Sequence, residues 1–252
     1  MKTALITGSS KRVGRGLALG LASRGYAIAV HYHKSEDQAA KLVAEIAEQG
    51  GTAHIFCADL TLVSDTENLI PYVARTLSAP ECLINNASTF DYDTAASFQS
   101  SLWDTQINTN LRAPALLSRD MAAELAPDKS GCIINLLDQK VENPNPEFFS
   151  YTVSKVALEA VTRLMAQALA PRIRVNAVAP GLTLPSGAQT QAQFEKTRAD
   201  LLLPTTSSVE AIVKAMFYLL DARSVTGQVL FVDGGERFQP HRDYSDTIKS
   251  KD

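Results

Sequence analysis

The chain has 252 residues, and 45% of them are hydrophobic, which is enough to bury the core of one α/β domain. Its formal net charge is −3 and no stretch is saturated with Lys or Arg, so we expect neither nucleic acid nor an anionic membrane as a partner. No apolar run suits a signal peptide or a bilayer span, so we expect a cytoplasmic protein that acts on a small molecule.

Short apolar runs of strand length alternate with longer segments of helical periodicity. The predicted strands are 3–7, 26–32, 52–58, 82–85, 132–137, 173–179 and 228–233. The predicted helices are 12–24, 35–49, 63–78, 102–125, 149–170 and 208–221, with a short amphipathic piece at 189–202. This alternation predicts a Rossmann fold, a doubly wound seven-stranded parallel sheet with helices on both faces. Ligands bind beyond the C-terminal ends of such strands, so functional residues should follow strands directly.

The chain shows no linker and no internal repeat. We expect one domain over residues 1–236 and a polar tail over 237–252, either frayed or folded onto a neighbouring subunit. Cys57, Cys82 and Cys132 are widely separated and lie in or beside strand-like segments. This pattern predicts buried thiols rather than a disulfide, a metal site or a nucleophile.

The first predicted strand runs into TGSSKRVGRG, residues 7–16. Gly8, Gly14 and Gly16 allow tight turns and a close helix start, where free N–H groups and the helix dipole attract a pyrophosphate. A glycine-rich turn without a ligand is the alternative. Lys11 and Arg12 add positive charge where phosphates would lie, and Arg12 occupies a position where a small residue is expected.

The second predicted strand ends in HYHKS, residues 31–35, without the Asp or Glu that holds both ribose hydroxyls in sites that prefer NAD. Lys34, Ser35 and Arg12 could bind a 2′-phosphate through charge-assisted hydrogen bonds, so NADPH is expected in preference to NADH. Ser35 is also expected to cap the next helix, and Lys34 could be an ordinary solvated charge. Asp59, after the third strand, would contact adenine or only form a turn.

The strongest chemical feature is YTVSK, in which Tyr151 and Lys155 are four residues apart and therefore share a helix face. Lowering the pKa of a tyrosine from near 10 by about three units requires roughly 4 kcal/mol of phenolate stabilisation. A nearby ammonium in a partly dry site can supply an interaction of that order. The pattern predicts Tyr151 as a proton donor and Lys155 as its electrostatic partner, although an isolated match of this kind can be an ordinary helix surface.

Together with NNA at 85–87, INTNLRAP at 107–114, PG at 180–181 and TGQVLFVDGG at 226–235, these motifs resemble the short-chain dehydrogenase/reductase family over nearly the full chain. The resemblance implies hydride transfer. It also implies that Asn110, with Asn108 as an alternative, kinks its helix and shapes a proton-relay water. Asn86 would border the cofactor and support the sheet, and a role in backbone hydrogen bonding alone is equally open.

Two departures from the usual family pattern are Arg12 at a glycine position and Asp138 at the position of the usual catalytic serine. Both resemble pteridine reductases, which carry TGxxKRxG, HYHxS, NNASxF and this aspartate. The resemblance implies that Phe90 covers one face of a flat pterin, with Ser88 and Arg12 near its polar edge. Reduction of a ring C=N bond needs a proton at nitrogen, so Asp138 would be a second proton-handling group. A turn role for Asp138 and ordinary packing for Phe90 are the alternatives.

The family resemblance also implies a homotetramer and a lid over the substrate at about 185–204. Within the lid, Phe194 or Leu201 would either touch substrate or pack the lid against the body.

The sequence therefore predicts an NADPH-dependent reductase of a dihydropteridine-type substrate. The alternatives are a reductase of a carbonyl compound, such as a ketone or a 3-oxoacyl thioester, and a non-catalytic NADPH-binding sensor. The predicted catalytic residues are Tyr151, Lys155, Asp138 and Asn110. The predicted cofactor contacts are Gly8, Ser10, Lys11, Arg12, Val13, His33, Lys34, Ser35, Asp59, Leu60, Asn86, Ala87, Ser88, Tyr151, Lys155, Pro180 and Gly181. The predicted substrate contacts are Arg12, Ser88, Phe90, Asp138 and Tyr151, and no metal is expected.

Overall fold

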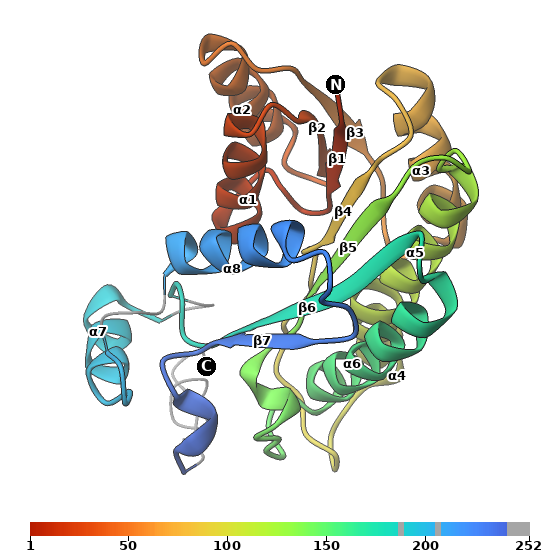
Figure 1. Cartoon of the computed structure of the whole chain (residues 1–252). Coiled ribbons are helices and arrows are strands. Elements are labelled where there is room, and N and C mark those ends of the chain that lie inside the picture. Colours follow the sequence, from red (N-terminus) through yellow and green to blue (C-terminus); the bar gives the residue numbers. More distant parts are fainter. Residues whose placement is uncertain (186–188, 205–207, 241–252) are drawn as a thin grey trace.

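A computed structural model describes residues 1–185, 189–204 and 208–240 (Figure 1). Its core is one seven-stranded sheet in the order β3-β2-β1-β4-β5-β6-β7, with every neighbouring pair parallel. The strands are β1 (Thr3–Ile6), β2 (Ala27–Tyr32), β3 (Ala53–Cys57), β4 (Cys82–Asn85), β5 (Gly131–Leu136), β6 (Ile173–Pro180) and β7 (Val229–Val232). The predicted doubly wound Rossmann fold is confirmed, and each predicted strand lies within about one residue of its observed position.

Helices cover both faces of the sheet (Figure 1). One face buries apolar side chains of α1 (Arg12–Ser23), α2 (Glu36–Glu48) and α8 (Val209–Asp221). The opposite face packs against α3 (Val63–Thr76), α5 (Ala113–Glu124) and α6 (Phe149–Leu169). Strands buried on both sides explain why their sequences are continuous apolar runs rather than alternating ones.

The predicted helix 102–125 is interrupted. It consists of α4 (Ser100–Ile107), a π-helical turn η1 (Asn108–Arg112) and α5. Pro114 lies two residues after the end of the turn and has no backbone N–H, so it cannot donate the α-helical bond to the carbonyl of Asn110 four residues earlier. The π turn therefore lies where the regular hydrogen-bond ladder is broken, and it contains Asn110, the residue that the family resemblance connects with a helix kink.

The prediction that all three cysteines are buried is wrong for Cys57. Cys82 and Cys132 are buried in the central strands β4 and β5, whereas Cys57 is exposed at the end of β3. The reason is topological, because β3 is an edge strand of the sheet and only part of it is covered.

The lid segment contains α7 (Gln191–Ala199), which starts with a capping box between Thr190 and Gln193. Phe194 and Leu201 are both buried, with 3% and 4% of their surface exposed, which agrees with packing rather than substrate contact. Residues 186–188 of the predicted lid and residues 241–252 of the predicted tail lie outside the described residues. Among the described helices, none has the length and apolar character needed to cross a bilayer.

A chain of buried polar side chains connects the middle of the sheet to α6. The amide of Asn85 donates to Asn135 Oδ1 at 2.8 Å, and Asn135 Nδ2 donates to Thr162 Oγ1 at 2.8 Å. All three residues are at most 2% exposed, so each depends on its protein partners. The hydrogen bonds between Asn85, Asn135 and Thr162 hold α6, the helix of the YxxxK motif, against β4 and β5.

Replacing Asn135 with Ala should lower the free energy of unfolding by about 3 kcal/mol, because Asn85 and Thr162 each lose a buried partner. Urea unfolding followed by circular dichroism measures this change. Asn68→Ala removes an exposed amide that donates to the Ser64 carbonyl and should change stability little. Equal stabilities of the two variants would show that the buried hydrogen bonds of Asn135 do not stabilise the fold.

Candidate active site

Tyr151 and Asp138 form a hydrogen-bonded pair at the C-terminal edge of the sheet. Asp138 follows β5 and begins the short 3-10 turn η2 (Gln139–Val141), where its Oδ1 accepts from the Lys140 N–H at 2.9 Å. Tyr151 lies in the first turn of α6, and its hydroxyl donates to Asp138 Oδ2 at 2.8 Å. The structure thus brings together two residues that the sequence singled out separately.

Both side chains of the pair are shielded from water, and this burial raises both pKa values. Burial raises the pKa of Tyr151 well above its ordinary value, and the neighbouring Asp138 carboxylate raises it further. Burial also raises the pKa of Asp138, although hydrogen bonds from the Lys140 N–H and the Tyr151 hydroxyl oppose the rise. The expectation that Lys155 lowers the pKa of Tyr151 is therefore wrong for this structure.

The position of Lys155 explains that difference. Its Nζ donates to the Leu136 carbonyl at 2.7 Å and lies 5.6 Å from the centre of the Tyr151 ring. Burial lowers the pKa of Lys155 to about 8, while Asp138 acts in the opposite direction. The Lys155 side chain is therefore held at the end of β5 by the Leu136 carbonyl.

Phe90 lies beside the pair. Its ring is edge-on to Tyr151 with 4.6 Å between centroids, and it is stacked on Phe148 at 4.1 Å and 9°. Phe90 remains 40% exposed, whereas Phe148 is buried. A planar ligand could thus contact Phe90 from its exposed side while Phe148 supports the ring from behind.

Asn110, in η1, is fully buried and saturated by protein partners. Its Oδ1 accepts from the Thr89 N–H at 2.9 Å and from Ser88 Oγ at 3.1 Å, and its Nδ2 donates to Ser154 Oγ at 3.1 Å. Asn110 therefore connects the loop after β4 to α6. Its role in a proton relay stays a prediction.

The loop after β1 has the shape of a phosphate cradle. Gly8 has φ +62°, and a Cβ on Gly14 would lie 2.4 Å from the Gly8 carbonyl oxygen, so only glycine fits there. Arg12 starts α1 with φ +52°, a left-handed conformation that costs a side-chain-bearing residue energy. Lys11 and Arg12 are both exposed at this helix start, which suits the binding of an anionic pyrophosphate.

Asn86 ties this loop to the end of β4. Its Nδ2 donates to the carbonyls of Thr7 at 2.8 Å and Gly8 at 3.2 Å, and Thr7 Oγ1 accepts from the N–H groups of Asn86 and Ala87. The structure thus supports a backbone-holding role for Asn86. Contact with the cofactor stays a prediction.

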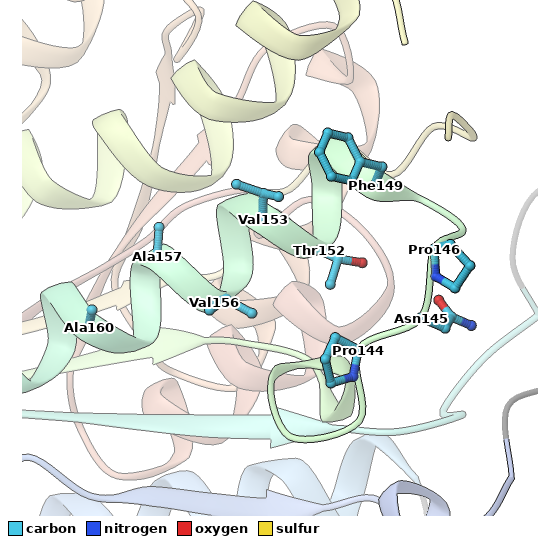
Figure 2. A pocket seen from close by; sticks show the side chains of 9 residues that line it. All are labelled: Pro144, Asn145, Pro146, Phe149, Thr152, Val153, Val156, Ala157 and Ala160. Carbon is cyan, nitrogen blue, oxygen red and sulfur yellow. The ribbon is translucent and has the colours of Figure 1, made fainter. Parts of the chain in front are cut away.

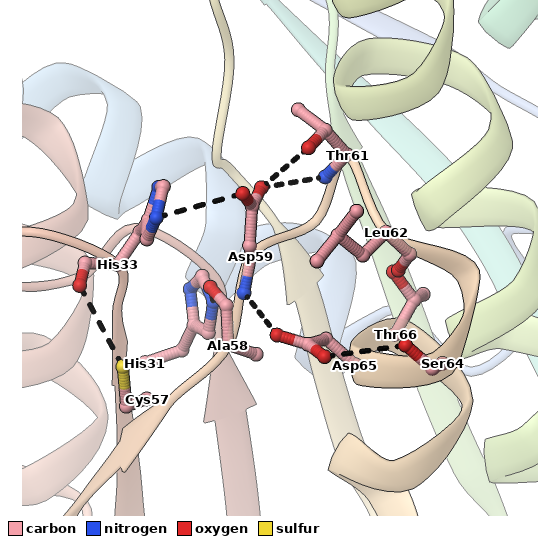
Figure 3. A network of polar contacts seen from close by, with 10 residues as sticks. All are labelled: His31, His33, Cys57, Ala58, Asp59, Thr61, Leu62, Ser64, Asp65 and Thr66. Atoms are coloured by element: carbon pink, nitrogen blue, oxygen red, sulfur yellow. Dashed lines mark hydrogen bonds and ion pairs between the residues drawn. The ribbon is translucent and has the colours of Figure 1, made fainter.

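Two histidines, His31 and His33, lie at the end of β2 and directly after it (Figure 3). His31 is buried, accepts from the Gly8 N–H at its Nδ1, and lies with its Nε2 3.1 Å from the Ala58 carbonyl oxygen. Burial lowers the pKa of His31 to about 4, so it is neutral at physiological pH. His33 is exposed and lies 3.6 Å from the Asp59 carboxylate.

Asp59 forms a turn, which is one of the two roles predicted for it from the sequence. Its Oδ1 accepts from the N–H and the hydroxyl of Thr61 at 2.9 and 2.7 Å (Figure 3). Burial pushes the pKa of Asp59 upwards, but the Thr61 hydrogen bonds and nearby His33 and Lys34 outweigh it and lower the pKa. Contact with adenine stays a prediction.

The remaining predicted cofactor residues follow β1, β2, β3, β4 or β6. Ser35 stands at the N-cap of α2, but its hydroxyl makes no capping hydrogen bond to the described residues, contrary to expectation. Lys34 is exposed beside it. The other predicted contacts lie at the same edge of the sheet, namely Ser10, Val13, Leu60, Ala87, Ser88, Pro180 and Gly181.

Sequence reasoning missed two residues that build the site. Phe148 stacks on Phe90, and Lys140 is buried with its Nζ 5.7 Å from the centre of the Phe148 ring. Burial lowers the pKa of Lys140, while Asp138 and two glutamates oppose this shift. Their closeness to Tyr151 and Asp138 along the chain was the only available signal.

Comparison with known proteins agrees with this geometry. Residues 2–196 match the model of the short chain dehydrogenase family. The 3-oxoacyl-[acyl-carrier-protein] reductase FabG of Staphylococcus epidermidis is 30% identical, over 93% of this chain and 98% of the relative. A short-chain type dehydrogenase/reductase of Picea abies is also 30% identical, over 93% and 92% of the two chains.

Two solved structures resemble the whole chain. FolM alternative dihydrofolate reductase 1 from Brucella canis, in complex with NADP, superposes with a TM-score of 0.92 at 37% identity and covers 96% of each chain. A blue fluorescent protein from a metagenomic library, in complex with NADPH, gives 0.85 at 29% identity over 93% and 97% of the two chains. With its parallel sheet, glycine loop and YxxxK helix, this chain belongs to the short-chain dehydrogenase/reductase family of oxidoreductases.

Proposed function

We propose that this protein is an NADPH-dependent reductase of a dihydropteridine-type substrate. The observation that carries the proposal is the buried Tyr151–Asp138 hydrogen bond with an exposed aromatic ring, Phe90, beside it. Bound NADPH would supply the hydride. The glycine loop with Arg12, and Lys34 and Ser35 after β2, would hold its phosphates.

The protein residues would handle the proton. With its raised pKa, the Tyr151 hydroxyl carries a proton at neutral pH. This proton would pass to a ring nitrogen that becomes basic as it gains electron density from the hydride, and Tyr151 would be left as a phenolate. Asp138, whose pKa is also raised, can share this proton with Tyr151 at its Oδ2. Lys155 would stabilise a negative charge on Asp138 or Tyr151, because its ammonium interacts electrostatically with Asp138.

A planar heteroaromatic substrate suits the shape of the site. Phe148 occupies one face of the Phe90 ring, and the 40% of Phe90 that is exposed would provide the surface on which a planar ring could stack. The likeness to the FolM dihydrofolate reductase, at 37% identity over nearly the whole chain, supports a substrate of this class.

A 3-oxoacyl or other carbonyl reductase is the second candidate. The likeness to FabG over 93% of the chain favours it. Asp138 favours the pteridine proposal instead. Both reactions need one hydride and one proton, but a serine at this position is enough to orient a carbonyl, whereas a carboxyl group can also take up or release a proton beside a ring nitrogen.

Replacing Asp138 with Ser should lower kcat/KM for a dihydropterin by about 100-fold, because the ring nitrogen loses a proton-handling group. The Kd for NADPH should change by less than about threefold. Steady-state assays with dihydropterins, dihydrofolate, ketones and a 3-oxoacyl thioester measure the first quantity, and fluorescence titration measures the second. Asp128→Ser, at an exposed site, is the control. Turnover of ketones or thioesters without turnover of any pterin would contradict the proposal.

Replacing Arg12 with Gly should raise the Kd for NADPH by about tenfold and leave that for NADH nearly unchanged, because one charge-assisted phosphate contact is lost. Glycine tolerates the left-handed conformation of Arg12, so folding should not suffer. Arg15→Ala is the matched control, because it removes another exposed cation of α1, one that is paired with Glu45 of α2. An unchanged preference for NADPH would locate the specificity at Lys34.

We further propose that the protein forms a homotetramer through α6. An apolar groove of about 610 Å³ runs along this helix (Figure 2) and is lined by Pro144, Asn145, Pro146, Phe149, Thr152, Val153, Val156, Ala157 and Ala160. Val156 and Leu164 are 41% and 64% exposed. Exposed apolar side chains beside such a groove are typical of contact surfaces between subunits.

Replacing Val156 with Lys should therefore shift the sedimentation coefficient towards a smaller species, because a charge would be buried in the contact. Tyr218→Lys, at a 56% exposed position on α8, should leave the assembly intact. The same sedimentation coefficient for wild type and Val156→Lys would argue against this interface.

A further inference from the structure

Asp93 is a buried acidic residue that the mechanism above does not use. It lies in the segment between β4 and α4, three residues after Phe90, and is 4% exposed. Its Oδ1 accepts from the Ser150 N–H at 3.0 Å, and its Oδ2 accepts from the Ser150 hydroxyl. Its backbone carbonyl accepts from the Phe149 N–H at 3.3 Å. All three bonds end in the first two residues of α6.

These bonds supply a cap that α6 lacks in its own sequence. The residue at the N-cap position, Phe148, is in a left-handed conformation with φ +53° and makes no side-chain capping bond to the described residues. The first turn of α6 contains no acidic residue. The initial N–H groups of a helix need acceptors, and a negative charge is favourable at this end of the helix dipole. Asp93 provides both from 57 residues earlier in the chain.

The same contact fastens the Phe90 segment to the helix that carries Tyr151. Next to Asp93, Thr94 forms an isolated antiparallel bridge with Glu147. On the other side, Phe90 stacks on Phe148 and lies edge-on to Tyr151. Ser150, which is completely buried, immediately precedes Tyr151. The position of Asp93 thus couples two groups of the site that belong to different elements.

We propose that Asp93 is a positioning residue, which sets the placement of Tyr151 relative to Phe90 by capping α6. The inference rests on the proposed function, which assigns proton donation to Tyr151 and stacking of the substrate to Phe90. The hydrogen bonds between Asp93 and the start of α6 do not depend on the substrate. A misplacement of a reacting group by about 1 Å can reduce turnover by about 100-fold, so a cap next to Tyr151 can influence the reaction without touching substrate.

The test compares Asp93→Asn, Ser150→Ala and the double variant with wild type. Asp93→Asn keeps the size of the side chain but removes its charge and presents an N–H₂ group to donors. We expect kcat to fall about 10- to 100-fold in Asp93→Asn and less in Ser150→Ala, which retains its backbone N–H. The Kd for NADPH should change less than about threefold, and the effects of the two substitutions should not add.

Ser208→Ala is the matched control. Ser208 Oγ caps α8 by accepting from the Ala211 N–H at 3.2 Å, and we assign no site residue to that helix. Its loss should lower the melting temperature without lowering kcat. If Asp93→Asn and Ser208→Ala lose similar stability and both keep wild-type kcat, Asp93 is only a structural cap. A parallel loss of kcat and NADPH binding in Asp93→Asn would also overturn the proposal.

A readout without substrate separates this proposal from the proposed function. Hydrogen exchange at the Ser150 amide should be about tenfold faster in Asp93→Asn than in wild type, because a neutral amide oxygen is a weaker acceptor than the carboxylate oxygen. The Phe149 amide donates to the backbone carbonyl of residue 93, which the substitution keeps, and it serves as the internal reference. Unchanged exchange at the Ser150 amide would refute the capping role. If wild type reduces a carbonyl compound and no pterin, the proposed function fails, and the same kcat comparison with that compound still decides the role of Asp93.

Discussion

All seven strands run in the same direction, and the order of the sheet reverses between β1 and β4. Every strand therefore ends at one edge of the sheet, and the loops that follow β1 and β4 diverge from adjacent strands. Asn86 and Thr7 connect these two loops by hydrogen bonds to backbone groups. Because of this one constraint, Phe90, Asp138 and Tyr151 lie next to one another at this edge although they are far apart in sequence.

Burial is the second physical factor, since it determines the protonation of the site. Tyr151 and Lys155 are 6% and 3% exposed, and burial disfavours the charged form of each. Burial also raises the pKa of Asp138, whose Oδ2 accepts the hydrogen bond of the Tyr151 hydroxyl. Burial thus keeps Tyr151 in its protonated form, which is the form that a proton donor requires.

The aromatic side of the site depends on contacts between segments. Phe90 comes from the loop after β4, whereas Phe148 and Tyr151 come from the start of α6. Asp93 and Asn110 join that loop to α6 at two different places, through Ser150 and Ser154. The stacking surface and the proton donor are therefore parts of one packed unit, although no single element contains both.

The fold can be predicted from the amino-acid sequence, because strand-length apolar runs and helical periodicity are local patterns that a parallel sheet requires. The sequence also identified the YxxxK pair, the glycine loop and the unusual Arg12 and Asp138, since spacing and residue type were sufficient. Three features depend on packing between distant segments: Tyr151 donates to Asp138, Lys155 donates to the Leu136 carbonyl, and Cys57 is exposed on an edge strand. The same holds for Phe148 and Asp93, because burial, pKa and capping across 57 residues arise from long-range packing that no local pattern encodes.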